Sequence, residues 1–402
     1  MKNLEEKARA YALKNARAHE GKAAQGSVIS SLFVDGLKKN EVRKWAKKIS
    51  EIVSEVNSLG VEEQEKEFEK LKFLVSERKR REGLEELPGV GKSGVIMRFA
   101  PSPSGPLHAG HAMTASLSFL YVKKYGGKFY IRIEDTNPEN IYPPAYKMIE
   151  NEAQWLFDNS AEILIQSYRM EIYYDCAKKL IEKKAAYVCS CSSDDFEKFV
   201  EKKTNCPCRN LSVEEQKKRW EKMLSFDENK NFKPGEAVLR FKSDMKNPNP
   251  AFRDFPLARI NLTRHPIQEN KYRVWPLMNL AVTADDIETG VTHVIRAKDH
   301  RDNAKRQEMM FNALGKKFPW TGFLGKFKFK DLELSTTKMR IAIEEKKYSG
   351  WDDGRLPTIV SLKKQGYGPQ AFWKFAEQIG LSENDKVMDR REFFLLLDNF
   401  NK

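Results

Sequence analysis

The chain has 402 residues and a formal net charge of +14, with 40% hydrophobic and 32% charged residues. This composition is typical of a globular protein with a substantial core, and it excludes collagen-like, mucin-like and wholly disordered chains. No apolar run approaches the ~18 residues that a membrane helix needs. Glu5, Glu6 and Lys7 stand where a signal peptide would be apolar. We therefore expect a cytoplasmic protein of two to four domains.

The excess of Lys and Arg, 71 against 57 Asp and Glu, favours a polyanionic partner. Nucleic acid is the usual partner of this kind, because basic side chains that neutralise phosphates release counterions. A lysine-rich surface on an ordinary globular protein would give the same charge. Composition alone leaves both interpretations open.

The first part of the chain, residues 1–92, is expected to be a helical extension. Apolar residues recur there at helical spacing, as in Leu4, Ala8, Tyr11 and Ala12, and again in Ile49, Ile52, Val53, Val56 and Leu59. The stretch Gly89–Ser93 superficially resembles a phosphate-binding loop, but Glu86 stands where that motif requires glycine. We interpret this stretch as a linker.

The next segment has the pattern of a strand, a loop, a helix and a second strand. The strands are expected at 95–100 and 128–133, and the helix from His108 to about Tyr125, where two glycines end it. This βαβ unit implies a parallel sheet with its ligand at the carboxyl ends of the strands.

Further along the chain, residues 272–281 and 292–296 are predicted to be strands of the same kind. The segment between the two halves, about 185–270, contains two cysteine pairs and β-like stretches such as 237–241. We expect it to be an insertion into the parallel sheet.

The most informative stretch, residues 98–111, reads R-F-A-P-S-P-S-G-P-L-H-A-G-H. Its prolines forbid regular structure before the helix, whose first turn presents His108 and His111 on one face. Gly110 leaves space for a planar ligand, and the N–H groups at the helix start favour a phosphate chain. The alternatives are two ordinary surface histidines or half of a metal site, although a helical metal pair usually needs a third ligand nearby.

This string resembles the HIGH signature of class I aminoacyl-tRNA synthetases, in the form typical of the glutamyl/glutaminyl subfamily. Three further stretches agree with that family, namely Arg132–Pro138, Gly290–Arg296 and Ser349–Asp353. The helical N-terminal residues also resemble the extension of archaeal-type members. The resemblance runs in consistent order from near residue 8 to near residue 395.

The resemblance implies an α/β fold, built on a class I synthetase Rossmann-like parallel sheet with an inserted zinc-containing α+β domain that binds the tRNA acceptor end. The implied boundaries are 1–92 for the helical extension, 93–184 and 273–330 for the two halves of the Rossmann domain, 185–272 for the insertion, and 331–402 for the second-signature loop and a helical stem-contact region. It also implies that the anticodon-binding β-barrels lie outside this sequence.

The family implies a two-step reaction. Glutamate attacks the α-phosphate of ATP, which brings Mg²⁺, and the glutamyl group then passes to the terminal adenosine of tRNA(Glu), with tRNA(Gln) as a further candidate. His108 and His111 are expected to donate hydrogen bonds to the triphosphate beside Gly110, and so to stabilise charge rather than exchange protons.

The second class I signature would lie on a mobile loop at Glu333–Thr337. Ser335 matches it, but both signature lysines are missing, so Lys338 or Arg340 is expected to supply the charge from one turn later. The resemblance assigns Ser335 and Lys338 to the catalytic machinery.

The amino-acid substrate is expected to be L-glutamate. Arg98 and Arg296 end two strands at the same edge of the sheet, and a guanidinium group pairs bidentately with a carboxylate. The resemblance assigns Glu134 to the α-ammonium group and Ala100 and Ser102 to the pocket wall. The alternative is that both arginines lie in surface ion pairs.

Four cysteines have the spacing of a metal site. Cys189 and Cys191 are followed, after fourteen residues, by Cys206 and Cys208. This pattern suits four thiolates around a tetrahedral Zn²⁺, which would be structural because no coordination position stays open. The alternative is four unrelated thiols. Cys176 is expected to be a buried thiol on a helix.

Other functions remain in view. The chain could be a glutaminyl-tRNA synthetase, a truncated paralogue that modifies a tRNA nucleoside, or a non-catalytic tRNA-binding subunit, as the weakened second signature would allow. A separate polypeptide could supply the anticodon-binding domain.

Overall fold

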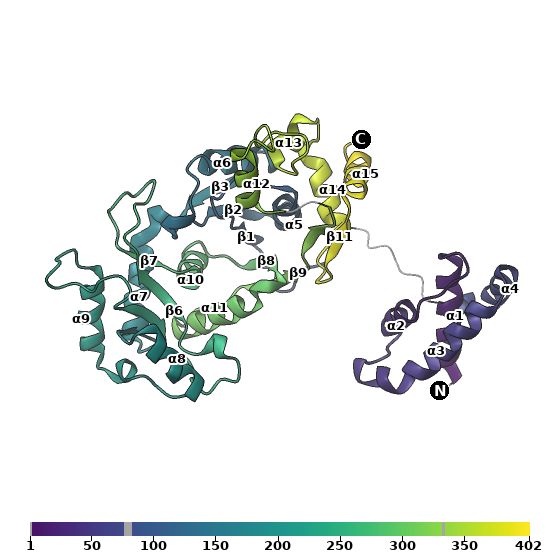
Figure 1. The fold of residues 1–402 in the computed structure, drawn as a ribbon, viewed down its shortest axis with the longest axis horizontal. Helices are drawn as coiled ribbons and strands as arrows, with labels where there is room; N and C mark the ends of the chain where they lie inside the picture. Colours follow the sequence, from purple (N-terminus) through teal and green to yellow (C-terminus); the bar gives the residue numbers. More distant parts are fainter. Residues whose placement is uncertain (1, 76–82, 332–333) are drawn as a thin grey trace. The chain divides into compact units, whose positions relative to one another are not determined.

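The computed structural model describes residues 2–75, 83–331 and 334–402. The chain divides into two compact units, Met1–Arg81 and Glu82–Lys402 (Figure 1). Among the described residues, no helix has both the length and the apolar character needed to cross a membrane.

The first unit is helical, as the periodicity predicts. Its helices are α1 (Lys2–Arg17), α2 (Gln25–Val34), α3 (Val42–Ser58) and α4 (Val61–Leu71), with 3₁₀ turns at Lys39–Glu41 and Lys72–Leu74. Helix α1 packs against α2, α3 and α4. The core contains the apolar side chains that recur at helical spacing, among them Ala8, Tyr11, Ala12, Ile49, Ile52, Val53 and Val56.

The second unit begins with three parallel strands in the order β1-β2-β3. The strands are β1 (Val95–Phe99), β2 (Gly127–Ile133) and β3 (Ala161–Ile165), and the helices that connect them are α5 (Ala109–Tyr125) and α6 (Ala145–Leu156). Arg98 pairs in register with Tyr130, so the carboxyl ends of β1 and β2 lie side by side. The predicted βαβ unit is confirmed.

Two glycines allow β1 and β2 to start this close together. A Cβ atom at Gly127, whose φ is +121°, would lie 2.0 Å from the carbonyl oxygen of Val95. A Cβ atom at Gly94 would lie 2.2 Å from the carbonyl oxygen of Gly126. No side chain fits either position without moving the backbone, so glycine is required at both.

An antiparallel sheet in the order β4-β5-β6-β7 forms the insertion. Its strands are β4 (Ala186–Cys189), β5 (Val238–Phe241), β6 (Pro256–Ile260) and β7 (Val274–Pro276), accompanied by α7 (Met170–Glu182), α8 (Ser193–Lys202) and α9 (Val213–Leu224). Cys176 is a buried thiol on α7, as predicted.

The prediction that residues 272–281 form a strand of the parallel sheet is wrong. Within this range β7 belongs to the antiparallel sheet, and α10 (Met278–Glu288) begins two residues after β7 ends. The eight consecutive residues Asn279–Asp286 of this helix are all buried. A short apolar run that is buried on all sides has no amphipathic period, so its sequence does not distinguish a strand from a core helix.

The parallel arrangement resumes with β8 (His293–Ala297), which pairs with β9 (Trp320–Leu324) after the crossover helix α11 (Arg301–Ala313). The backbone N–H of Thr292 donates to the carbonyl oxygen of Ile96 at 2.9 Å, and the N–H of Ile96 donates to Oγ1 of Thr292 at 2.9 Å. The predicted strand at 292–296 therefore lies beside β1.

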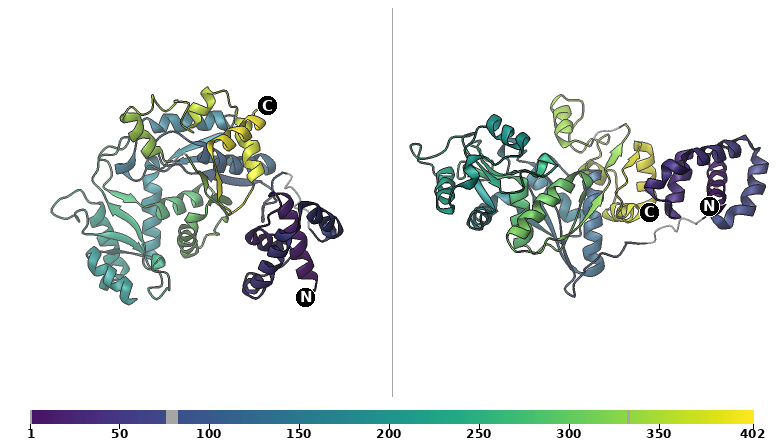
Figure 2. Two further views of the ribbon diagram at one scale, coloured as in Figure 1. Left: turned by 45° about the vertical axis from the view of Figure 1, so that its right-hand side comes forward. Right: turned by 90° about the horizontal axis from the view of Figure 1, so that it is seen from below.

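The C-terminal elements are β10 (Phe327–Phe329), α12 (Thr336–Glu344), α13 (Ile359–Lys364), α14 (Pro369–Ile379), β11 (Lys386–Met388) and α15 (Arg390–Phe400). Helix α14 packs against α5, where Trp373 and Phe119 have ring centroids 5.3 Å apart. Within the second unit, α8 and α9 of the insertion lie at the opposite end from α14 and α15 in every view (Figures 1 and 2).

Candidate active site

The carboxyl ends of β1, β2 and β8 open into one cavity of about 930 Å³. The sequence-predicted residues that line it are Arg98, Ala100, Ser102, His108, His111, Glu134, Arg296 and Ser335. Polar side chains from five places, the ends of β1, β2 and β8 and the starts of α5 and α12, thus come together. The cavity lies at the sheet edge where the βαβ rule puts a ligand.

The two histidines of the signature form a stacked pair at the start of α5. His108 is the N-cap residue, and its Nδ1 accepts the backbone N–H of His111 at 3.3 Å. Because Nδ1 accepts, the proton of a neutral His108 is on Nε2. Nδ1 of His111 is buried and has no hydrogen-bond partner among the described residues.

Burial lowers the pKa of both imidazoles, that of His111 to about 4 and that of His108 well below its ordinary value. For His108 the neighbouring His111 adds to this effect. The pair is therefore neutral near pH 7. Two neutral imidazoles can donate hydrogen bonds to an anion, but they carry no formal charge of their own.

The loop in front of His108 is attached to the C-terminal region. The N–H of Ala109 donates to the carbonyl oxygen of Pro357 at 2.8 Å, and the N–H of Ile359 donates to that of Leu107 at 2.8 Å. The N–H of Leu107 also donates to the buried carboxylate of Glu152 at 2.6 Å. These contacts, which the sequence did not indicate, fix the start of α5.

Arg98 is held by a carboxylate that sequence reasoning missed. Its Nε and Nη2 donate to the two carboxylate oxygens of Asp286 at 3.2 and 3.1 Å. Arg132 donates to the same carboxylate at 2.5 Å and approaches Glu134 at 3.4 Å. Burial alone would raise the pKa of Asp286, but the two guanidinium groups hold it below its usual range.

Glu134 lines the cavity and accepts a hydrogen bond from Arg132. Burial raises the pKa of its carboxyl group, and the guanidinium groups of Arg132, Arg98 and Arg296 oppose this shift. Its side chain is 20% exposed, so one oxygen remains available to a ligand in the cavity.

Among the described residues, no carboxylate forms a direct ion pair of this kind with Arg296. Its Nη1 donates to the amide oxygen of Gln307 at 2.8 Å, while its buried Nε has no hydrogen-bond partner among the described residues. Burial, with repulsion from Arg98, lowers the pKa of this guanidinium to about 9, although the nearby carboxylates of Glu134 and Asp286 oppose the shift. A buried cation under these conditions is a site for an anionic ligand.

The second-signature segment reaches the cavity through Leu334, Ser335 and Thr336. Ser335 is the N-cap of α12, and the hydroxyl of Thr336 lies 2.7 Å from that of Ser104. The side chain of Lys338 is exposed and is not among the residues that line the cavity. Glu333, the first residue of the predicted motif, lies outside the described residues.

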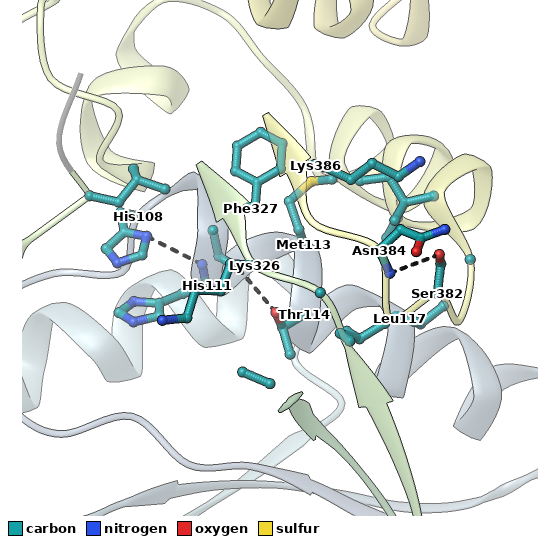
Figure 3. Close-up of a pocket in the computed structure, with 18 residues that line it drawn as sticks. His108, His111, Met113, Thr114, Leu117, Lys326, Phe327, Ser382, Asn384 and Lys386 are labelled. Atoms are coloured by element: carbon teal, nitrogen blue, oxygen red, sulfur yellow. Dashed lines mark hydrogen bonds between the residues drawn. The ribbon is translucent and has the colours of Figure 1, made fainter. Parts of the chain in front are cut away.

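A smaller cavity of about 230 Å³ adjoins the histidine pair (Figure 3). It shares His108, His111, Thr114, Ala297 and Leu334 with the larger one, and it also includes Gly110. A Cβ atom at Gly110 would lie 3.1 Å from Cε1 of His108 and 3.2 Å from Cδ1 of Leu334. Glycine at this position therefore keeps the space beside the imidazole open.

The four cysteines of the predicted metal site lie together in the insertion. Their Sγ atoms are all within 4.8 Å of one another. The Sγ atoms of Cys189 and Cys206, and those of Cys191 and Cys208, are 3.9 Å apart. A tetrahedron with Zn–S bonds of about 2.3 Å has edges of about 3.8 Å. This arrangement of thiols therefore fits a four-coordinate metal.

Comparisons with known proteins agree on one family. A family model described as tRNA synthetases class I (E and Q), catalytic domain, matches residues 94–396. The chain is 42% identical to a glutamate–tRNA ligase of Methanobrevibacter smithii, over 100% of this chain and 71% of that protein. It is 43% identical to the one of Methanothermobacter marburgensis, over 97% and 70% of the two chains.

One solved structure has a similar fold. It is a glutamate tRNA ligase from Elizabethkingia meningosepticum, with 24% sequence identity and a TM-score of 0.50. The match covers 71% of this chain and 60% of that chain.

Proposed function

The chain belongs to the class I tRNA synthetases of the E and Q type, and on this premise we propose that its cavity activates glutamate with ATP and transfers it to tRNA. The curated relatives are named glutamate–tRNA ligase, and the chain is an aminoacyl-tRNA synthetase of this kind. The observation that carries the proposal is the meeting of Arg98, Glu134 and Arg296 with the histidine pair in one cavity.

The amino-acid end of the cavity suits a dicarboxylic substrate. We assign the side-chain carboxylate of glutamate to Arg296, whose charge no carboxylate of the described residues neutralises by a direct ion pair, and the α-ammonium group to Glu134. Ala100 and Ser102 also line the cavity. Glutamine would leave the buried charge of Arg296 unpaired, which disfavours a glutaminyl enzyme.

The nucleotide end lies at the start of α5. In the proposal, the triphosphate lies against the histidine pair and the adenine ring lies beside Gly110, between the two cavities. Among the described residues, the cysteine cluster is the only group of three or more metal-ligating side chains. Mg²⁺ would therefore be held mainly by the phosphate oxygens, whose negative charge it would offset.

Activation then needs few protein groups. The α-carboxylate oxygen of glutamate forms a bond to the α-phosphorus, and the bond to the bridging oxygen of pyrophosphate breaks. Charge moves onto pyrophosphate during this step, and the N–H groups of the two histidines can follow it by hydrogen bonding. In the second step a ribose hydroxyl of the terminal adenosine attacks the acyl carbon, and AMP leaves.

The second signature is proposed to act on the pyrophosphate side. Ser335 lines the cavity, and Lys338 follows in the first turn of α12, so a change in the loop that moves this turn inward would bring the lysine to the phosphates. We propose Ser335 and Lys338 as catalytic residues.

The four cysteines are proposed to hold a structural Zn²⁺. Cys189, Cys191 and Cys206 with Cys208 would provide four ligands, which leaves no open position for a substrate. Binding would stabilise the segment around β4 and α8, where few apolar side chains are buried apart from the cysteines themselves.

The tRNA is proposed to lie along the insertion, 185–272, and the C-terminal region, 331–402. The first Rossmann half is 93–184. The second half, expected at 273–330, begins after β7, which pairs with β6 of the insertion, and the appended helical unit, expected at 1–92, ends at Arg81. tRNA(Glu) is the substrate in this proposal, tRNA(Gln) is a second substrate to be tested, and the anticodon reader is assigned to a separate polypeptide or a further stretch of chain.

The deciding experiment is ATP–pyrophosphate exchange by the purified chain with glutamate or glutamine, with and without tRNA. We expect exchange with glutamate and formation of glutamyl-tRNA. Exchange with glutamine alone would replace the assignment by a glutaminyl enzyme, and no exchange under any condition would favour a tRNA-binding subunit. Charging of whole tRNA compared with an acceptor-stem minihelix tests how much the rest of the tRNA contributes.

A further inference from the structure

The buried side chain of Gln307 on α11 touches the guanidinium group of Arg296. Gln307 is 2% exposed, and its Oε1 accepts Nη1 of Arg296 at 2.8 Å. Because arginine only donates, the amide oxygen must face it. The amide Nε2 then points the other way and donates to Oδ1 of Asn279 at 3.2 Å.

A second arginine fixes the far end of this chain of amides. Nδ2 of Asn279 donates to Oδ1 of Asn303 at 3.3 Å, and Nη1 of Arg306 donates to the same oxygen at 3.1 Å. Arg306 therefore sets the orientation of Asn303, and Arg296 sets that of Gln307. All the members between the two arginines are neutral amides.

Arg98 and Arg296 differ in the charge of the side chains that hold them. Asp286 provides Arg98 with two carboxylate contacts inside the protein, so the charge of Arg98 is compensated before any substrate arrives. Arg296 receives one amide oxygen and no carboxylate from the contacts described, and its Nε stays buried without a partner.

We propose that Gln307 is a positioning residue that determines specificity, because it orients Arg296 without neutralising it and so leaves the charge for the side-chain carboxylate of glutamate. This inference rests on the proposed function of the cavity and goes beyond it. A carboxylate at position 307 would form an internal pair with Arg296 and compete directly with the substrate.

The test compares Gln307→Glu with Gln307→Met in ATP–pyrophosphate exchange. Both variants keep the length of the side chain, and only the first adds a charge. We expect Gln307→Glu to raise the KM for glutamate by roughly 10- to 100-fold relative to Gln307→Met, the range of one hydrogen bond between charged groups. The KM for ATP should stay within about twofold, and the preference for glutamate over glutamine should fall.

Equal effects of the two variants on the glutamate KM, or a parallel rise in the ATP KM, would overturn the inference and leave the proposed function intact. Absence of glutamate-dependent exchange in the unmodified chain would overturn both. Thermal melting checks that each variant is folded.

If Gln307→Glu does not fold, Asn279→Asp places the charge one amide further from Arg296. We expect a smaller rise in the glutamate KM, about threefold or more. No rise in a folded Asn279→Asp variant would then count against the inference.

Discussion

The imidazole rings of His108 and His111 lie face to face, with centroids 3.6 Å apart and planes inclined by 18°. Two protonated rings would repel each other strongly at this separation, because His108 is buried and His111 is half-buried. The stack is therefore built for the neutral form, and this has a consequence for the dependence of the enzyme on pH.

We expect the glutamate-dependent exchange rate to show no inflection from these histidines between about pH 6 and 8, because burial lowers the pKa of His111 to about 4 and that of His108 well below its ordinary value. The rate profile of the unmodified chain, compared with that of His111→Gln, checks this prediction. An inflection near pH 6.5 that disappears in the variant would contradict it.

The free energy of unfolding depends on the same pKa shift. The unfolded chain binds protons near pH 6.5 that the folded chain does not bind, so the free energy of unfolding falls as the pH drops from about 6.5 toward 4.

Asp286 is expected to be a main source of stability at the site. Asp286→Asn removes the charge that compensates Arg98 and Arg132, and we expect a loss of about 3–5 kcal/mol in the free energy of unfolding. Urea denaturation followed by circular dichroism measures this. Asp175→Asn is the control, because its ion pair with Lys178 is solvent-exposed and should contribute less than about 1 kcal/mol. Similar losses in the two variants would show that the charge of Asp286 contributes no more to stability than an exposed ion pair does.

The cysteine cluster should bind one zinc ion per chain. We expect Cys208→Ser to lose the metal and a strong chelator to make the segment 185–210 sensitive to proteolysis, because the metal replaces a larger apolar core there. Elemental analysis and limited proteolysis are the measurements. Cys176→Ser is the control, since this thiol lies on α7 outside the cluster. Retention of zinc by Cys208→Ser would show that the metal lies elsewhere.

Glu152 should make stability depend on pH in the opposite direction from the histidines. Burial raises the pKa of its carboxyl group to about 8, although the N–H groups of Leu107 and Val360 oppose the shift. Between about pH 4.5 and 8 the folded chain holds a proton that the unfolded chain releases, so this contribution to stability is present at low pH and is lost as the pH rises.

The variant Glu152→Gln cannot titrate. Its stability relative to the unmodified chain should therefore increase from pH 5 to pH 8 by a few kcal/mol, because each tenfold difference in proton affinity between the folded and unfolded chains corresponds to about 1.4 kcal/mol. Urea denaturation at several pH values tests this. A difference that stays constant with pH would mean that Glu152 is ionised in the folded chain throughout.

The role of the second signature can be tested by a substitution at Lys338. Because pyrophosphate gains charge only as the reaction proceeds, Lys338→Met should lower kcat by roughly 10- to 100-fold and leave the KM for glutamate unchanged. Arg340→Met is the comparison, because Arg340 lies on the same helix, 3.8 Å from Glu344 and over the ring of Tyr142. A larger loss in Arg340→Met would transfer the role to that residue.

Much of the site could be predicted because its residues lie at strand ends. Arg98 and Glu134 follow directly from the βαβ pattern, which brings the carboxyl ends of β1 and β2 to one edge. Arg296 could be placed there by the same rule once its strand was identified. The cysteine spacing was equally informative, because two Cys-x-Cys pairs separated by a short segment are typical of a four-thiolate metal site.

The residues that hold these side chains could not be predicted in the same way. Asp286 and Gln307 lie on helices, and their contacts with Arg98 and Arg296 depend on how α10 and α11 pack against the sheet. Glu152 contacts Leu107 across 45 positions of sequence. Arg132 is a charged residue in an apolar strand, and Asp286 ends an apolar run. Such charges indicate that a partner exists, but the sequence does not show which residue it is.

The wall of the cavity is shared between two parts of the chain. Arg259 on β6 and Pro276 on β7 belong to the inserted sheet, yet they line the same cavity as Arg98. A chimera that exchanged this insertion with that of another synthetase would transplant a piece of the cavity wall along with it. Graft boundaries that spare β6 and β7 would leave that wall unchanged.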